Sequence, residues 1–135
     1  MSTVLIRSAL EARLNSMTPA IATAFENVSF TPPSSTVPYQ EAHVLFARPD
    51  NRETGTSHQE LGYLQVKLLY PMGQGSGAAM ARAELLRTTF VRASTVTSGG
   101  VVVNIIETPE ITTVGNENGR YCVIVKIRFR SFIPN

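Results

Sequence analysis

Residues 61–90 decide the fold and read LGYLQVKLLYPMGQGSGAAMARAELLRTTF. Over Tyr63–Tyr70, apolar and polar side chains alternate, which is the period of a strand with one buried face. Pro71 has no N–H to donate, so we expect the strand to end there. From Ala78 to Phe90 the apolar residues recur at helical spacing. The stretch therefore predicts a strand that leads through a glycine-rich turn into a helix.

The chain before this stretch predicts two helices and one strand. Apolar residues from Leu5 to Met17 fall on one face of a helix. Pro19 suits the first position of a second, short helix, which we place at Pro19–Glu26. Three prolines within residues 27–40 exclude a central strand, so an extended crossing segment is expected there. Alternation then predicts a strand over Tyr39–Arg48.

The chain after the stretch predicts the remaining strands. Val101–Ile106 is rich in β-branched residues, which favours a strand. From Tyr121 to Phe129 the inward positions are apolar, while Lys126, Arg128 and Arg130 face outward. We therefore predict an α+β fold with an antiparallel or mixed sheet of about four strands and helices packed on one face. At this length, residues 1–135 are expected to form a single domain.

Composition narrows the class of protein. The chain has 135 residues, of which 43% are hydrophobic and 16% charged, and its formal net charge is +2. That charge is too mild to indicate nucleic acid, so we do not expect nucleic acid as a specific ligand. The single Cys122 excludes an internal disulfide, and no apolar run is long enough for a membrane span. Arg7, Glu11 and Arg13 interrupt the N-terminal apolar residues, so we expect no signal peptide and a soluble product made inside a cell.

The glycine-rich turn suggests a nucleotide site. Residues Gly73–Ala78 fit the pattern G-x-G-x-x-G/A between a strand and a helix, as in dinucleotide-binding proteins. However, the preceding strand is amphipathic, and no acidic residue stands about 20 positions later to bind a ribose. A flexible turn is the simpler interpretation. A small nucleotide-binding enzyme that uses this loop remains the alternative from another class.

Groups for catalysis or metal binding are sparse. His43 and His58 have no cysteine or second histidine at metal-ligand spacing. Cys122 opens a strand among apolar neighbours, which indicates a packing residue. We therefore expect no catalytic residue, no cofactor and no metal, and we do not expect an enzyme.

Two polar regions are the candidates for protein contacts. Residues 48–60 form the longest polar run, and long polar loops in compact domains are often functional, so we predict a mobile flap. The outward residues of the last strand form a basic stripe without an aromatic stacking partner on that face. The stripe is compatible with a solvated face, with docking on an acidic protein, or with binding to nucleic acid. The interface candidates are Arg48, Arg52, Glu53, His58, Lys126, Arg128 and Arg130.

The order of several short motifs resembles the tail terminator proteins of long-tailed bacteriophages. After an N-terminal amphipathic helix come AFENVSFTP at 24–32, Pro38-Tyr39, and a strand that ends near Arg48. A polar loop, LGYLQV at 61–66, and the pattern Pro71-x-Gly73-x-Gly75 before a helix follow. The resemblance covers essentially the whole chain. None of these motifs is catalytic, and the specificity comes from their order.

The resemblance implies a structural virion assembly protein. Such a protein closes into a ring, usually a hexamer, on the end of the tail tube, where it stops tube polymerisation and offers a surface to head-completion or neck proteins. It would be part of the virion tail and would assemble in the cytoplasm of the host bacterium. Another neck or head–tail joining protein is a close alternative. For the ring itself, neighbouring copies need two different complementary patches.

Overall fold

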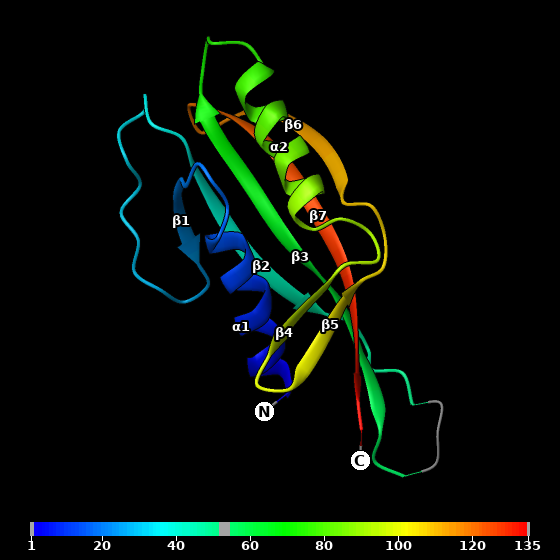
Figure 1. The fold of residues 1–135 in the computed structure, drawn as a ribbon. Coiled ribbons are helices and arrows are strands. Elements are labelled where there is room, and N and C mark those ends of the chain that lie inside the picture. Colours follow the sequence, from blue (N-terminus) through cyan, green and yellow to red (C-terminus); the bar gives the residue numbers. More distant parts are fainter. Residues whose placement is uncertain (1, 52–54, 135) are drawn as a thin grey trace.

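The computed structural model describes residues 2–51 and 55–134, and over these residues the chain forms seven strands and two helices (Figure 1). In chain order they are α1 (Ser2–Asn15), β1 (Ala22–Phe25), β2 (Tyr39–Phe46), β3 (His58–Pro71), α2 (Gly77–Thr89), β4 (Thr95–Ser98), β5 (Val101–Ile105), β6 (Glu110–Glu117) and β7 (Arg120–Ile133). Neither described helix is long and apolar enough to cross a membrane.

All seven strands belong to one sheet built on β3 and β7. These two strands pair antiparallel along their full length, from His58 opposite Ile133 to Pro71 opposite Arg120. On the other side of β3 lies β2, and β1 pairs with β2 in parallel. The far side of β7 is shared, because β6 pairs with its first half and β5 with residues near its end, while β4 extends the sheet from β5. The sheet is therefore mixed, and it curls around the helices.

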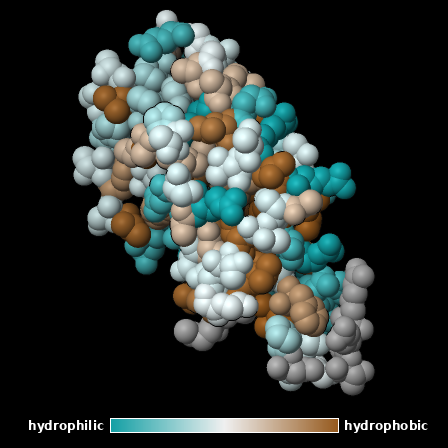
Figure 2. Space-filling model, in the orientation of Figure 1, coloured by the Kyte–Doolittle hydropathy of each residue, from teal (hydrophilic) through white to brown (hydrophobic). Residues whose placement is uncertain are grey.

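The core fills the hollow of this curled sheet. Alternate residues of the central strands point into it, among them Leu64 and Val66 of β3 and Val125 of β7, all fully buried. Leu10 of α1 and Leu86 of α2 belong to the same cluster. Burial of these apolar residues is the main force that holds helices and sheet together. Seen from the side on which the helices lie, the surface mixes hydrophobic and hydrophilic residues (Figure 2).

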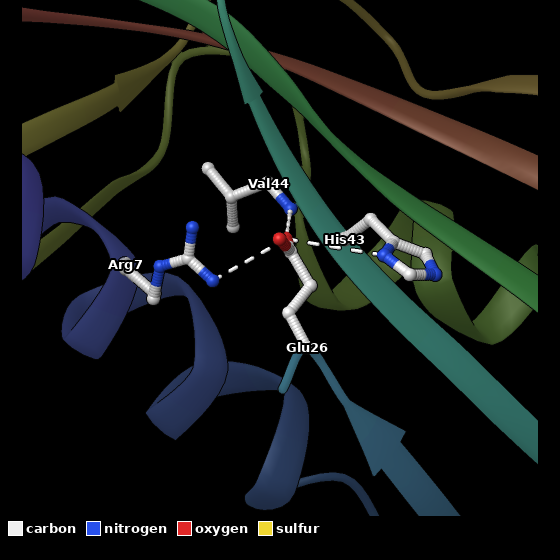
Figure 3. Close-up of polar contacts among 4 residues, drawn as sticks. All are labelled: Arg7, Glu26, His43 and Val44. Atoms are coloured by element: carbon white, nitrogen blue, oxygen red, sulfur yellow. Dashed lines mark hydrogen bonds and ion pairs between the residues drawn. The ribbon is translucent and has the colours of Figure 1, made fainter. Parts of the chain in front are cut away.

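The α1 helix is also tied to the β1–β2 edge of the sheet through Glu26. Its Oε1 accepts a hydrogen bond from the backbone N–H of Val44 at 2.6 Å (Figure 3). The same oxygen lies 3.3 Å from Nη1 of Arg7 on α1 and 4.0 Å from Nδ1 of His43. β1 pairs with β2 only as far as Ala42. Beyond that point the backbone N–H of Val44 donates to the Glu26 carboxylate instead of to a β1 carbonyl. Glu26 therefore has a structural role in this fold.

The predicted fold class is wrong. Strands make up 45% of the protein and helices 20%, in a single curled seven-stranded sheet that resembles half a barrel, instead of a four-stranded sheet with helices packed on it. The sequence prediction missed β1 and β4. These short strands lie at the margins of the sheet, so their own side chains show little alternation and their pairing decides their conformation.

The predicted helix at Pro19–Glu26 is also wrong. Ala22–Phe25 forms β1, which pairs with residues 39–42 of β2. The side chain of Gln40 donates a hydrogen bond to Thr23 Oγ1 at 2.9 Å. This pairing partner is 17 residues away in the chain, so the local sequence pattern could not reveal it.

Other predictions are confirmed. The N-terminal helix, the strand from Tyr39, the strand–turn–helix unit of residues 61–90 and the long last strand are all present. The polar loop is shorter than expected because His58, Gln59 and Glu60 already belong to β3. Arg52 and Glu53 lie outside the described residues, and the mobility of the flap stays a prediction.

Candidate interaction surface

The face of the sheet that points away from the core has a covered half and an open half. The crossing segment of residues 27–38 covers the half near the start of β7. There Phe30 stacks on Tyr39 with the ring centres 5.4 Å apart, and Leu69 and Cys122 complete a second small apolar cluster. Burial raises the pKa of the Cys122 thiol, and the predicted packing role of this residue is confirmed.

Arg120 holds the crossing segment in place. Its guanidinium donates hydrogen bonds to the carbonyl oxygens of Pro33, Ser34 and Val37 at 2.9, 2.9 and 2.7 Å. Its central carbon also lies 4.7 Å from the centre of the Tyr39 ring. Only 7% of this residue is exposed. Although Arg120 is close in sequence to the basic stripe, it is an internal anchor and not part of the open surface.

The open half is a mixed basic and apolar surface, which we call the basic outer face. Strand register places its residues side by side, because Leu45 lies opposite Tyr63, Tyr63 opposite Arg128, and Leu61 opposite Arg130. Leu45 is 42% exposed and Phe132 is 47% exposed. The face comprises Leu45, Leu61, Tyr63, Lys126, Arg128, Arg130 and Phe132.

Tyr63 is the centre of this face. The Lys126 ammonium lies 5.3 Å and the Arg128 guanidinium carbon 5.8 Å from the centre of its ring, both within the range of cation–π attraction. The sequence analysis expected no aromatic partner for the basic stripe, and that expectation is wrong. Tyr63 is 63 residues before Lys126, and only the β3–β7 register brings them together. An aromatic residue flanked by arginine is typical of protein interfaces.

The charges of the face are only partly balanced. Arg128 lies 3.4 Å from Glu107 and 3.9 Å from Glu110, but all three side chains are well exposed, so these pairs contribute little to stability. Within residues 2–51 and 55–134, no carboxylate forms an ion pair with Lys126 or Arg130. The basic outer face is therefore complementary to an acidic surface.

Arg48 and His58 lie at one end of the sheet, and alternation along β3 places His58 on the side of Leu64, opposite to Tyr63. His58 is the first residue of β3, opposite Ile133 of β7, and its Nε2 lies 2.9 Å from Glu60 Oε1. Asp50 and Gln59 exchange two backbone hydrogen bonds of 2.9 Å. Arg48 is exposed and lines an open depression of about 440 Å³ together with Leu61. The structure thus brings Arg48 and His58 to the same end of the sheet as Arg130.

The glycine-rich loop has a conformational explanation. Gly73 and Gly75 have φ values of 78° and 76°, a region that other residues rarely adopt, so both are needed for the turn between β3 and α2. Among the described residues, no group of three or more His, Cys, Asp or Glu is placed to hold a metal ion.

Comparison with known proteins assigns the chain to a family. A solved structure that carries only a sequence identifier is similar to it, with 30% sequence identity, a TM-score of 0.80, and coverage of 100% of this chain and 99% of that one. No curated protein sequence matches. The family model described as phage tail terminator protein matches residues 5–129, which span both helices and the sheet up to Phe129. The chain therefore belongs to the phage tail terminator protein family, whose members are structural components of the virion tail.

Proposed function

We propose that this protein closes into a ring on the end of the tail tube, stops tube polymerisation and presents a surface for head attachment. The match to the tail terminator family over residues 5–129 carries the proposal. We further propose that the ring is a hexamer and assembles in the host cytoplasm. The tube protein and a head-completion or neck protein would be its partners.

The basic outer face is our candidate for the contact with an acidic protein surface. It combines exposed apolar side chains, the aromatic ring of Tyr63 and the cations Lys126 and Arg130, which form no ion pair with the part of the chain that the structure describes. Such a surface gives orientation and association rate through charge and gives affinity through its aromatic centre. Arg48, Arg52, Glu53 and His58 remain proposed interface residues at the β3 end of the sheet.

Electron microscopy with purified tail tubes tests this function. We expect the protein to bind tube ends and to stop tube growth when it is present during polymerisation. The double change Lys126→Glu and Arg130→Glu should abolish this binding by reversing charge on the face. Arg92→Glu is the matched control, because Arg92 is also exposed but lies in the α2–β4 connection. Absence of the unchanged protein from tube ends would overturn the proposal.

Co-sedimentation distinguishes the proposed function from its closest alternative, a neck or head–tail joining protein. If the protein sediments with DNA-filled heads and not with tails, it is a neck or head–tail joining protein that acts from the head side. Equal loss of tube binding in the Arg92→Glu control would show that overall charge, and not the basic outer face, controls the contact.

A further inference from the structure

A small apolar pocket lies on the helix-bearing side of the sheet, opposite the basic outer face. Its volume is about 310 Å³, and its exposed lining is mostly carbon. Pro19 and Ile21 form one wall, Tyr70 at the end of β3 forms the back, and Ala81, Arg82 and Leu85 of α2 form the other wall. The volume is at the small end of the range of ligand pockets, which starts at about 300 Å³. It suits one large apolar side chain of a protein segment.

Arg82 makes this pocket unusual. Only 5% of the residue is exposed, and its Nη1 donates a hydrogen bond to the carbonyl oxygen of Pro19. Burial lowers the pKa of the guanidinium, although an arginine still keeps its charge at neutral pH. No carboxylate of the described residues forms an ion pair with it. A buried cation without a counter-charge is costly, so a carboxylate that reached it would be bound strongly.

A neighbouring cavity explains how two further buried polar atoms can be hydrogen-bonded, but it offers no counter-charge to the Arg82 guanidinium. Nε of Arg82 and Oε1 of Gln40 are both buried without a hydrogen-bond partner, and both residues line a second cavity of about 10 Å³. This volume is close to that needed for one water molecule, which would satisfy both atoms. A water molecule is neutral, however, so the guanidinium charge would still lack a counter-ion.

We propose that the pocket binds a segment of another protein in which an apolar side chain stands next to a carboxylate. The apolar side chain would fill the space between Ile21 and Leu85, and the carboxylate would pair with Arg82 through charge-assisted hydrogen bonds. A second copy of the chain fits poorly. None of the exposed large apolar residues in the described part of the chain has an acidic residue as its immediate sequence neighbour. The pocket is thus a contact site for a different protein, separate from the basic outer face.

The test uses NMR of the whole protein with isotope-labelled arginine side chains and methyl groups. The probe is N-acetyl-L-leucine, which carries a carboxylate at neutral pH, and the matched neutral compound is N-acetyl-L-leucine amide. We expect saturable shifts at Arg82 Nε, Ile21 and Leu85 with the carboxylate in the millimolar range, and binding about tenfold weaker with the amide. Equal binding of the two compounds, or no shift at these three residues, would overturn the proposal.

Two variants separate binding from folding. Ala81 is exposed at the pocket wall, so Ala81→Leu should fill the pocket and abolish the shifts while the spectrum stays folded. Arg82→Met should remove the preference for the carboxylate over the amide. If Arg82→Met unfolds the protein, Ala81→Leu still tests the proposal, because unchanged probe binding in Ala81→Leu would refute the site. Concentration-dependent shifts at Ile21 and Leu85 without a probe would assign the pocket to a second copy instead.

Discussion

Tyr63 and Arg128 lie directly opposite each other on β3 and β7, and the Arg128 guanidinium carbon is 5.8 Å from the centre of the Tyr63 ring. Lys126 approaches the same ring from the next outward position of β7. The ring keeps two cations close together on an otherwise open sheet face. Cations at alternate positions of β7 thus become part of a surface with an aromatic centre and a basic rim, an arrangement typical of protein interfaces.

Replacement of Tyr63 should affect tail-tube binding more than folding. Tyr63→Ala removes the ring at the centre of the basic outer face, so binding to tube ends should fall by at least about tenfold, the effect of a moderate hot spot. Because the ring is only half-buried, the free energy of unfolding should fall by about 1 kcal/mol or less. Urea unfolding and tube-binding assays measure the two effects. Tyr63→Phe keeps the ring and should retain most of the binding; a loss as large as that of Tyr63→Ala would contradict the role of the ring.

Gly62 should not tolerate a side chain. A Cβ at this position would lie 2.1 Å from the carbonyl oxygen of Leu45 and 3.1 Å from Cζ of Phe129, so β2 and β3 would have to separate. We expect Gly62→Ala to lower the free energy of unfolding by about 2 kcal/mol or more, measured by urea denaturation. Gly77→Ala is the control, since nothing lies within 4 Å of its added Cβ and it starts α2. The control should be neutral or slightly stabilising, and a similar loss in both variants would refute this account.

Arg120 should be needed for the order of the crossing segment. Arg120→Met removes three hydrogen bonds to the carbonyl oxygens of residues 33, 34 and 37, and we expect a loss of about 2–4 kcal/mol in the free energy of unfolding. Amide hydrogen exchange at Val37, whose N–H bonds to Ser34, should also become faster. Arg120→Lys should recover only part of the stability, because an ammonium lacks the planar group that reaches all three acceptors. Full recovery by lysine would show that charge alone is sufficient.

The Cys122 thiol should react slowly and should make the fold less stable at alkaline pH. Burial raises its pKa in the folded protein, so the unfolded chain loses the proton first as the pH rises. The unfolded state then binds fewer protons, and the free energy of unfolding should decrease as the pH rises above about 8.5. Lys67 contributes in the same direction at higher pH, above the ordinary lysine value of 10.5, since its hydrogen bond to Glu117 raises its pKa in the folded state.

Two measurements check this prediction. Labelling of Cys122 with iodoacetamide should be much slower in the native protein than in urea. In Cys122→Ala, the decrease in the free energy of unfolding over the same pH range should be smaller than in the unchanged protein. Rapid labelling of the native thiol, or an equal pH dependence in both proteins, would contradict the burial of this group.

The elements with a strong period of their own were predictable from sequence. The central strand before Pro71, the helix that follows the glycine turn and the last strand carry enough alternating or helical apolar positions to specify both their type and their buried face. The outward position of Lys126, Arg128 and Arg130 followed from the same alternation. The order of motifs along the chain was also sufficient to indicate the tail terminator family, which the match over residues 5–129 confirms.

Contacts between distant segments decided the rest. The strand β1 exists because residues 22–25 pair with residues 39–42, and β5 and β6 share one side of β7 through pairings that join distant parts of the chain. Tyr63 joins the basic stripe through strand register, while Arg120 and Arg82 are buried and bond to carbonyl oxygens of the crossing segment and of Pro19. Local sequence determines periodicity, whereas burial, strand pairing and ion-pair partners depend on which surfaces meet in three dimensions. For this protein, the local pattern gave the long elements, and only the tertiary structure decided which charged residues can meet a partner.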